Sequence, residues 1–461
     1  MSNPLVTIYI TNYNYEKYIK QAIESCLNQT YKNYELFIID DGSTDNSQSI
    51  IEAYAEYDKV QVIYQTNKGL NITNNIALRL AHGKYIMRLD ADDYLAYDAI
   101  AQMVAILESE DNLGLIFPDY YLVNEDGTVT EQIIRHDFEN EVSLLDQPAH
   151  GACTMIRTEF LRSIGGYNEN YNCQDGYELW IKFTLNYPVK NINKPLFYYR
   201  QHGHNLTSNE QRILGTRAAI HQEHINKKFK DIPTIAIIPV RGQSTSKKSV
   251  AHITLADQTI LERKVNAALN TKYIKKIIIS SPDEYIAGLV NQRYTDYNEV
   301  VFHKRNIKEA RMNTNLNNTV KEILKNLGEE VNAYKALALL YIEYPFIKSA
   351  TIDDAINAMF LFGSDSLISV RQDNSMFFQH HGDGMKAILN QDKFTKLERE
   401  SLYRLSGGIN VAKIKSFQEA KKMMCGKIGH IEITREEAIG LHTKYDVEIA
   451  ELIVNKKHQI S

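Results

Sequence analysis

A run of aspartates closes an apolar stretch early in the chain. Residues 85–94 read YIMRLDADDY, so Asp90, Asp92 and Asp93 directly follow residues that suit a buried strand. Three carboxylates this close together repel one another strongly where water is excluded. A solvated turn or a bound cation would offset that repulsion, and this segment alone leaves both options open.

A second acidic pair follows an earlier apolar stretch. Asp40 ends the strand-like YELFIID, and Asp41 begins the turn-forming DGSTDNS. Such a turn usually needs no ligand. Two acidic clusters at equivalent ends of neighbouring strands nevertheless favour a binding site, because ligands of open α/β sheets bind beyond the carboxyl ends of the strands. Oxygen ligands suit Mg²⁺ or Mn²⁺ that holds phosphates.

The elements that must position these carboxylates alternate between strands and helices. Alternation of this kind predicts βαβ crossovers on a mainly parallel sheet. From about Leu113 the pattern becomes strand-rich, with a hairpin turn expected at 125–127 and a helix over 174–185. The expected strands and helices of the earlier part occupy 5–11, 15–29, 34–40, 60–64, 72–81 and 85–89.

A second series of strands and helices begins after a polar stretch that ends near Asp231. A chain of 461 residues is too long for one ordinary core, and we place the boundary at Pro233, which gives domains of 1–231 and 232–461. The predicted fold class is therefore α/β, with two tandem Rossmann-like nucleotide-binding domains. Strand-like runs of the second series occupy 234–244, 275–284, 300–305, 336–346 and 365–371.

Composition and charge exclude several classes of function. The net charge of -5 provides no basic field for nucleic acid. No apolar run approaches the roughly 20 residues of a membrane helix. The N-terminal MSNPLVTIYIT enters a strand rather than a signal peptide, and four scattered cysteines are expected to be reduced thiols. We therefore expect a cytoplasmic protein that does not bind nucleic acid.

Four motifs, in order, resemble those of the family 2 glycosyltransferases. VTIYITNYNYEKYIKQAIESCLNQTYKNYELFIIDDGSTDNS is similar to the opening signature of the family, and AHGKYIMRLDADD to the segment that contains its D-x-D. IGGYNENYNCQDGYELWIKF resembles the acceptor-side motif, and YYRQHGHNLTS resembles the closing strand and loop. The resemblance covers about residues 4–210 and implies the nucleotide-sugar-binding fold known as GT-A.

The resemblance implies donor-binding roles for four residues. Thr11 and Tyr13 should line the nucleotide pocket, with Tyr13 stacked on the base or beside its edge. Asp41 should accept a hydrogen bond from the ring N–H of the base, which favours a UDP-sugar, and a position as a helix N-cap is compatible with that role. Asp90 should contact the ribose or the shell of the metal.

The resemblance also implies a metal cofactor, Mn²⁺ or Mg²⁺. Asp92 should bind the ion that bridges the donor diphosphate, whereas Asp93 either joins it or caps the next helix. Relatives often carry a histidine after YR-x that reaches the metal or the phosphates, which implies a ligand role for His202. Without the resemblance, a lone exposed histidine is usually a loop residue. The cation and the phosphates would offset the repulsion among the aspartates.

Asp175 is the expected catalytic base. A lone aspartate at the start of a helix-compatible stretch would ordinarily be an N-cap, but in relatives the carboxylate at this place deprotonates the acceptor hydroxyl. A sugar hydroxyl needs such a group because it is a poor nucleophile until its proton is accepted. Many relatives carry a second acid where this chain has Gln174. Trp180 is expected to pack in the core.

The second domain resembles the cytidylyltransferases of the CMP-sialic-acid synthetase family. TIAIIPVRGQSTSKKSV is similar to their nucleotide loop, which implies that Arg241 and Lys248 could contact a triphosphate. Gly440 and His442 occupy the places of the metal-binding aspartates, so we expect a non-catalytic domain. Synthetases of this family generally dimerise through this domain, which implies a homodimer.

The sequence thus predicts a metal-dependent inverting glycosyltransferase of surface polysaccharide synthesis. Its expected partners are a UDP-sugar donor and a glycan or lipid-linked acceptor, with peripheral attachment to the inner face of the membrane as a further option. Two alternatives stay open. One is a bifunctional enzyme that also makes a CMP-activated nonulosonic acid. The other is a nucleotide-sugar-binding protein without catalysis.

Overall fold

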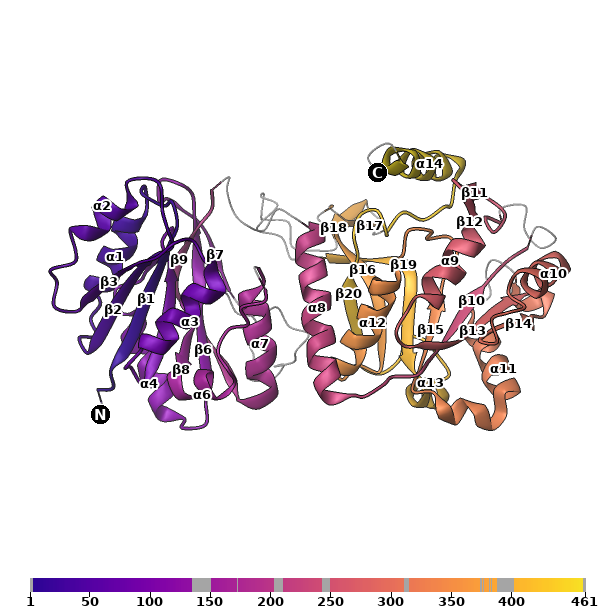
Figure 1. The fold of residues 1–461 in the computed structure, drawn as a ribbon, viewed down its shortest axis with the longest axis horizontal. Helices are drawn as coiled ribbons and strands as arrows, with labels where there is room; N and C mark the ends of the chain where they lie inside the picture. The colour runs from indigo at the N-terminus through magenta and orange to yellow at the C-terminus, as the bar shows by residue number, and fades with distance from the viewer. Residues whose placement is uncertain are drawn as a thin grey trace. The chain divides into compact units, whose positions relative to one another are not determined.

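The computed structural model describes most of the chain, and the described residues form two compact units. The units comprise residues 1–217 and 218–461, and Figure 1 shows their elements. The division falls inside one helix, whereas the sequence placed the domain boundary at Pro233. The described residues are 3–134, 151–171, 173–202, 210–242, 249–310, 315–373, 375, 377–380, 382, 384–387 and 402–458.

Unit 1 is built on a mixed sheet with the strand order β3-β2-β1-β4-β8-β6-β9-β5, and β7 pairs with β6. Strands β3, β2, β1 and β4 are mutually parallel, as the βαβ pattern predicts. Strand β8 is antiparallel to both of its neighbours. The strands are β1 (Val6–Asn12), β2 (Tyr34–Asp40), β3 (Val60–Tyr64), β4 (Tyr85–Asp90), β5 (Tyr94–Leu95), β6 (Leu115–Val123), β7 (Val129–Ile133), β8 (Met155–Arg157) and β9 (Val189–Arg200).

Helices cover both faces of this sheet. Along β1, Ile8 and Ile10 pack in one core with residues of α1 and α4. Tyr9 points to the other face and packs in a second core with residues of α3 and α7, because successive side chains of a strand alternate between faces. The helices of unit 1 are α1 (Ile19–Leu27), α2 (Ser47–Glu52), α3 (Leu70–Leu80), α4 (Ala99–Ser109), α6 (Thr158–Ser163) and α7 (Asp175–Asn186). Helix α8 (Glu210–Lys228) contains the division between the two units.

Two local predictions in unit 1 are confirmed. A hairpin joins β6 to the antiparallel β7 at the predicted turn, where Gly127 has a φ of 87° that side chains with a Cβ rarely adopt. Trp180 is buried and its ring lies edge-on to Phe117 at 5.7 Å. It is therefore part of the core.

Unit 2 contains a second mixed sheet with the order β14-β13-β10-β15-β19-β16-β20. Its first four strands are parallel, and β19 is antiparallel to both β15 and β16. The strands are β10 (Thr234–Pro239), β13 (Ile274–Ser281), β14 (Val300–Lys304), β15 (Ala336–Leu340), β16 (Ser366–Asp373), β19 (Leu402–Lys413) and β20 (Ile428–Glu432). Separate two-stranded pieces are β11 (Thr254–Leu255) with β12 (Gln258–Thr259), and β17 (Phe378–His380) with β18 (Met385–Ala387).

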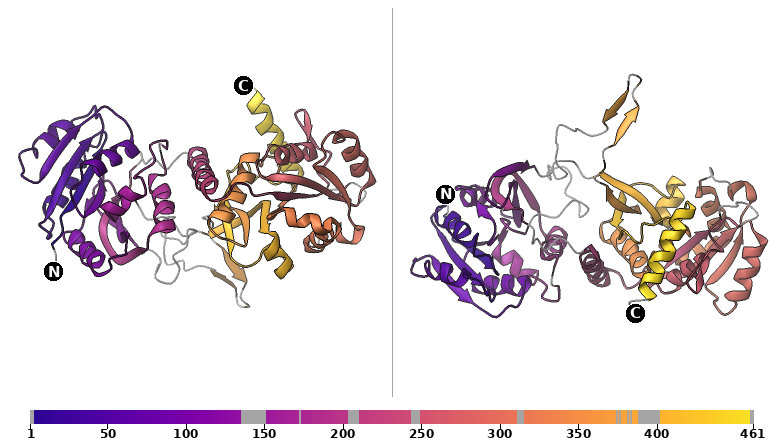
Figure 2. Two further views of the ribbon diagram at one scale, coloured as in Figure 1. Left: turned by 60° about the horizontal axis from the view of Figure 1, so that its bottom comes forward. Right: turned by 90° about the horizontal axis from the view of Figure 1, so that it is seen from above.

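The helices of unit 2 flank its large sheet, and the β17–β18 hairpin stands away from that sheet in the right-hand view of Figure 2. The nucleotide-binding character of the two units stays a prediction, since only their mixed α/β architecture is observed. The helices are α9 (Ile260–Leu269), α10 (Glu284–Arg293), η2 (Ile307–Ala310), α11 (Asn317–Leu327), η3 (Gly328–Ala333), α12 (Ser349–Leu361), α13 (Ile414–Ala420) and α14 (Lys444–His458).

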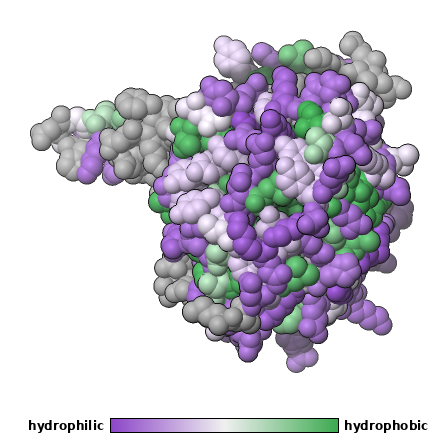
Figure 3. All heavy atoms as spheres, turned by 90° about the vertical axis from the view of Figure 1, so that its left-hand side faces the viewer, coloured by the Kyte–Doolittle hydropathy of each residue, from purple (hydrophilic) through white to green (hydrophobic). Residues whose placement is uncertain are grey.

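The surface polarity and the state of the cysteines can be compared with what the composition predicts. The face of unit 1 that Figure 3 shows is largely hydrophilic, and its apolar residues lie in small separate groups. Within the described ranges, none of the helices is both long enough and apolar enough to cross a bilayer. All four cysteines carry free thiols, and three of them are buried.

Candidate functional site

The carboxyl ends of three parallel strands bring the two acidic clusters together. In the register of β1 with its neighbours, Thr11 lies opposite Asp90 of β4, and Asn12 lies opposite Asp40 of β2. The strand order β3-β2-β1-β4 reverses direction at β1. Ligands of open α/β sheets bind at such a switch point, so both clusters lie where the fold favours a ligand.

Asp90 is held between a hydroxyl and an arginine. Thr11 Oγ1 donates to Asp90 Oδ1 at 3.2 Å, and Arg88 Nε lies 2.9 Å from the same oxygen. The arginine side chain is buried, whereas the Asp90 side chain is 25% exposed. The charge of Asp90 therefore has an internal partner, while part of its carboxylate still faces the outside.

Asp92 and His202 contact each other directly. His202 Nε2 lies 2.9 Å from Asp92 Oδ2, and both side chains are largely buried. Two tyrosines of the segment after β1 enclose the imidazole: the ring of Tyr15 lies edge-on at 5.7 Å, and the ring of Tyr18 is stacked at 5.8 Å. The structure thus brings together the two residues that the sequence assigned to the metal.

A short antiparallel pairing places His202 beside the aspartates. Strand β5 immediately follows Asp93 and pairs with the end of β9. Arg200, the last residue of β9, donates its backbone N–H to Asp93 Oδ1 and its Nε–H to the carbonyl of Asp92, both at 2.9 Å. Asp93 therefore fixes the end of β9, and the cap position of α4 belongs to Asp98.

The pKa values of the buried aspartates reflect their crowding. Burial raises the pKa of Asp92, and the neighbouring Asp90 raises it further. Burial, Asp92 and Asp90 together hold the pKa of Asp93 well above its usual range. Burial and the same carboxylates raise the pKa of the Tyr15 hydroxyl. The crowded carboxylates therefore favour the binding of a cation in this pocket.

The residues present fit a small divalent cation. Adjacent ligands of an octahedral ion with bonds of about 2.1 Å lie roughly 3 Å apart, close to the 2.9 Å between Asp92 Oδ2 and His202 Nε2. The buried Asp93 Oδ2 has no hydrogen-bond partner among the described residues. Those residues contain no group of three or more His, Cys, Asp or Glu side chains poised around a metal. A magnesium-type site normally completes its shell with phosphate and water.

Asp41 organises the loop before α3. Its Oδ1 accepts from Gln65 Nε2 at 2.7 Å and from the Lys68 N–H at 2.8 Å, and its Oδ2 accepts from the Gly69 N–H at 2.9 Å. Asp41 is not the N-cap of α2, which is Asn46. Since a carboxylate offers about four acceptor positions, these three bonds leave room for a further donor.

Asp40 has a structural role at the same edge. Its fully buried carboxylate accepts from Asn12 Nδ2 at 2.8 Å and from the Ser43 N–H at 2.9 Å. These bonds fix the turn that presents Asp41. Tyr13, one residue beyond β1, is 46% exposed, so its ring is available at the edge of the site.

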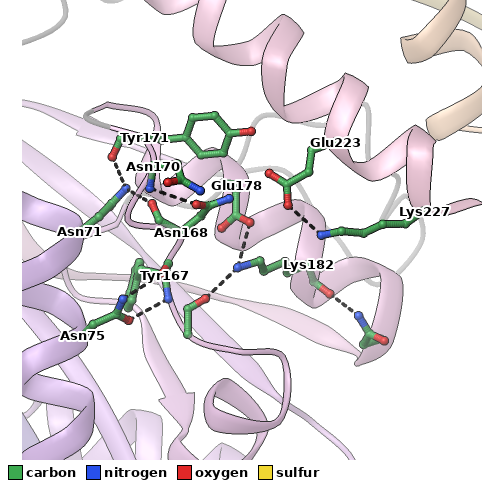
Figure 4. A network of polar contacts seen from close by, with 12 residues as sticks. Asn71, Asn75, Tyr167, Asn168, Asn170, Tyr171, Glu178, Lys182, Glu223 and Lys227 are labelled. Carbon is green, nitrogen blue, oxygen red and sulfur yellow. Dashed lines mark hydrogen bonds and ion pairs between the residues drawn. The ribbon is translucent and has the colours of Figure 1, made fainter.

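Two asparagines of α3 hold the segment that leads to α7. Asn71 Nδ2 donates to the carbonyls of Asn168 and Tyr171 at 2.8 and 2.6 Å. Asn75 exchanges hydrogen bonds with both backbone groups of Tyr167, each at 2.9 Å, and Figure 4 shows these side chains pointing at that segment. The same helix begins at the loop that Asp41 fixes, so α3 links the two parts of the site.

Asp175 is the first residue of α7, and its side chain lies outside the described part of the structure. Gln174 has a φ of 62°, a conformation that residues other than glycine adopt rarely and often near functional sites. Its Oε1 accepts from Arg217 Nε at 2.9 Å. One turn later, the buried Glu178 pairs with Lys182 at 2.9 Å.

Sequence reasoning missed Arg88, Arg200 and the α3 asparagines. The signal for the arginines is their position: Arg88 lies inside an apolar strand and Arg200 lies at the end of one. A charged side chain at such a place needs a partner. Asn71 and Asn75 were signalled by their spacing, since asparagine is a poor helix former and two residues four apart share a helix face.

Unit 2 contains a small pocket beside the residues that the second resemblance singled out. Arg241 and Arg305 line it with Glu309 and Glu343. Arg305 is buried and donates to the carbonyl of Val240 at 3.0 Å. Burial and the nearby Arg241 lower the pKa of Arg305 to about 10.

The loop that contains Gly440 and His442 adjoins this pocket. The backbone N–H of Leu441, between Gly440 and His442, donates to the carbonyl of Glu343 at 2.8 Å. The imidazole of His442 lies edge-on to the ring of Tyr344, with 5.8 Å between the ring centroids. Lys248 lies outside the described residues.

Comparisons with known proteins agree with the first resemblance. The family model "Glycosyl transferase family 2" matches residues 7–165. The chain is 32% identical over 203 residues to the chondroitin synthase of Escherichia coli, covering 44% of this chain and 30% of that protein. It is 31% identical over 204 residues to the hyaluronan synthase of Pasteurella multocida, again covering 44% of this chain but 21% of that protein. The chain therefore spans less than a third of these synthases.

Another relative is matched over most of its length. An uncharacterized glycosyltransferase of Haemophilus influenzae is 30% identical over 223 residues, which is 44% of this chain and 68% of that protein. Among solved structures, S. aureus TarS 1-349 in complex with UDP-GlcNAc aligns with a TM-score of 0.43 at 15% identity, covering 87% of this chain and 99% of that one. On the sequence matches, the chain belongs to glycosyl transferase family 2.

Proposed function

We propose that the chain transfers a sugar from a nucleoside diphosphate to a hydroxyl of a glycan or lipid-linked acceptor. The observation that carries this proposal is the meeting of Asp90, Asp92 and His202 at the carboxyl ends of parallel strands in a family 2 chain. The alternative of a binding protein without catalysis is disfavoured, because both the acidic cluster and Asp175 are present.

The donor would lie across the ends of β1, β2 and β4. The hydroxyl of Thr11 donates a hydrogen bond to the Asp90 carboxylate there. Part of that carboxylate is exposed and could accept a hydrogen bond from a ribose hydroxyl. Tyr13 is exposed beside them and would contact the base. Asp41, whose carboxylate retains acceptor capacity, would receive the ring N–H of a uracil. These roles support a UDP-sugar donor.

Asp92 and His202 would hold Mn²⁺ or Mg²⁺, with Asp93 beside them. A bound divalent cation would neutralise the negative charge that develops on the departing diphosphate. Arg88 and Arg200 hold the surrounding backbone and carboxylates in place.

Asp175 would accept the proton of the acceptor hydroxyl during a single displacement at the anomeric carbon, with inversion. General-base assistance of this kind typically contributes about 10²–10⁴-fold to rate. The position at the start of α7 supports the role, because the left-handed Gln174 and the asparagine-held loop before it restrict where that residue can lie.

The relatives suggest the product class. Since the matched synthases are named for chondroitin and hyaluronan, we assign the transfer step to the synthesis of a polysaccharide, at the cytoplasmic side of a membrane. Unit 2 would be a non-catalytic, cytidylyltransferase-like unit that forms a homodimer.

The alternative of a bifunctional enzyme, with a second activity in unit 2, is supported by one specific observation. The pocket of Arg241 and Arg305 could hold an anion such as a nucleotide phosphate. Gly440 offers no side-chain ligand and His442 offers nitrogen, which Mg²⁺ disfavours. The non-catalytic assignment therefore stands ahead of the bifunctional one.

The decisive experiment is a donor screen of the full chain. UDP-, GDP-, dTDP- and CMP-sugars are incubated with Mn²⁺, and both release of the nucleotide and thermal stabilisation by the matching nucleotide are measured. We expect Mn²⁺-dependent release of UDP and stabilisation by UDP. Stabilisation without release, even with glycan acceptors present, would identify a binding protein instead.

A further inference from the structure

The turn before α7 starts the helix in an unusual way. Gln174 occupies the N-cap position with a φ of 62° and a ψ of 30°, and its side chain makes no capping hydrogen bond to the described residues of the helix. An N-cap residue normally has an extended backbone and a side chain that accepts from the first turn. Because residues with a Cβ rarely adopt this left-handed conformation, contacts outside the helix have to hold Gln174 in it.

Arg217 of α8 supplies such a contact. Residues 210–217 of α8 belong to unit 1, and Arg217 Nε donates to Gln174 Oε1 at 2.9 Å. The guanidinium also lies over the ring of Tyr177, 5.0 Å from the ring centroid, in a cation–π contact. Arg217 therefore bridges the residue that precedes α7 and a residue of its first turn.

Thr216, the residue before Arg217, contacts the same turn. Its Oγ1 lies 3.2 Å from Cys173 Sγ. Asn71 of α3 holds two carbonyls earlier in the same segment. The segment is therefore fixed by α3 at its beginning and by α8 at its end, and Asp175 follows directly.

We propose that Arg217 is a positioning residue for the transfer reaction, an inference that rests on the proposed role of Asp175 as the base. By holding Gln174 in the left-handed conformation, Arg217 sets the direction in which the chain enters α7 at Asp175. A displacement of about 1 Å in a reacting group can cost about 10²-fold in rate. The contact therefore acts on turnover rather than on the affinity for the donor.

Glycine at position 174 separates positioning from simple packing. Glycine adopts positive φ values readily, so a Gln174→Gly chain keeps the turn without the help of Arg217. A contact that only packs α8 against α7 would matter equally in both backgrounds, because the ring of Tyr177 is present in each.

The experiment is a double-mutant cycle in the full chain. For Arg217→Ala, Gln174→Gly and the double variant, we measure release of UDP at a saturating concentration of the UDP-sugar that the wild type turns over, with glycan acceptors present. The dissociation constant of UDP with Mn²⁺ and the unfolding temperature are measured beside it. Arg217→Ala should lower turnover by about tenfold or more, with UDP affinity unchanged. In the Gln174→Gly background the same change should alter turnover by less than about twofold. Gln211→Ala, exposed on the same part of α8, is the control and should turn over like the wild type.

The results that would overturn the proposal differ from one another. An equal loss of turnover in both backgrounds would make Arg217 a packing residue. Weaker UDP binding by Arg217→Ala, in proportion to the lost turnover, would place its effect at the donor. An active wild type whose turnover is unchanged by Arg217→Ala would remove this inference alone. A wild type that neither turns over a UDP-sugar nor binds UDP would remove the proposed function as well.

Discussion

Asp92 Oδ2 lies 2.9 Å from His202 Nε2, although 110 positions separate the two residues. The contact depends on the short pairing of β5 with β9. A buried contact between a carboxylate and an imidazole, assembled from two distant segments in a pocket that raises the pKa of its own carboxylates, contributes little to stability and suits the binding of a cation.

Asp92→Ala should abolish Mn²⁺-dependent binding of UDP without lowering the stability of the ligand-free protein. The stability is retained because the change removes one member of a crowded carboxylate cluster. Thermal unfolding with and without UDP and Mn²⁺ measures both effects, and Asp111→Ala, at an exposed position, is the control. Full Mn²⁺-dependent turnover in the Asp92 variant would show that the metal is held elsewhere.

Asp175→Asn should lower turnover by about 10²-fold or more, while the affinity for the donor stays nearly constant. The amide retains shape and hydrogen bonding but cannot accept the proton. Initial rates at saturating donor and the dissociation constant of UDP separate the two quantities, and Asp111→Asn serves as the matched control. If donor binding were lost and turnover of bound donor preserved, Asp175 would belong to the donor site.

Asn75→Ala should destabilise unit 1 by about 1–3 kcal/mol, because it removes the two buried hydrogen bonds that Asn75 makes with the backbone of Tyr167. Urea unfolding gives the change in free energy. Asn186→Ala is the comparison: that residue is exposed on α7 and its side chain donates to the carbonyl of Lys182 in the same helix, so its loss should be nearly neutral. Equal losses in the two variants would mean that the loop is not held by α3.

Lys264 should make unit 2 more stable as the pH rises above neutrality. Burial lowers its pKa to about 7, although Glu343 and Glu437 act in the opposite direction, whereas a lysine in the unfolded chain titrates near 10.4. Between these pH values the unfolded state binds more protons, so stability rises by up to about 1.4 kcal/mol per pH unit. As the pH falls through about 7, this gain is lost.

The measurement compares urea unfolding of the wild type and Lys264→Met at pH 7, 8 and 9. The difference between the two should change steadily with pH, since the variant lacks the titrating group. Lys321→Met, at an exposed position of α11, should leave the pH dependence of the wild type intact. A parallel response of Lys264→Met and the wild type would contradict the shifted pKa.

The full chain should release no pyrophosphate from CTP in the presence of Mg²⁺ and nonulosonic acids. This expectation follows from the proposed resemblance of unit 2 to cytidylyltransferases, which implies that Gly440 and His442 stand in place of the carboxylates that would align the reactants on Mg²⁺. A coupled pyrophosphate assay, run beside an active CMP-sialic-acid synthetase, provides the comparison. Metal-dependent release would establish the bifunctional alternative.

The strands of the first half were predictable because buried strands leave strong local patterns. The expected strands at 34–40 and 60–64 agree with β2 and β3. Helix ends were less accurate: the expected helix at 15–29 is shorter in the structure, Ile19–Leu27. Apolar spacing reports which face of a helix is buried, but its end depends on caps and loops that spacing does not encode.

The site was predictable in its residue types and only partly in its contacts. Asp92 and His202 could be named from motifs, but their meeting depends on the β5–β9 pairing, which joins residues far apart in sequence. The role of Asp41 in holding the loop at Gly69 was equally hidden. Patterns within a short stretch of sequence do not predict which distant segments will pair.

The dependence of His202 on the end of β9 has a consequence for how the protein is made. During synthesis the N-terminal segments leave the ribosome first, so the aspartates after β4 are exposed long before Arg200 and His202 exist. The acidic cluster cannot acquire its last partner until β9 has been added to the sheet beside β5. Nascent chains that stop before this point should therefore lack tight cation binding, and the capacity to hold the donor should appear only when unit 1 is almost complete.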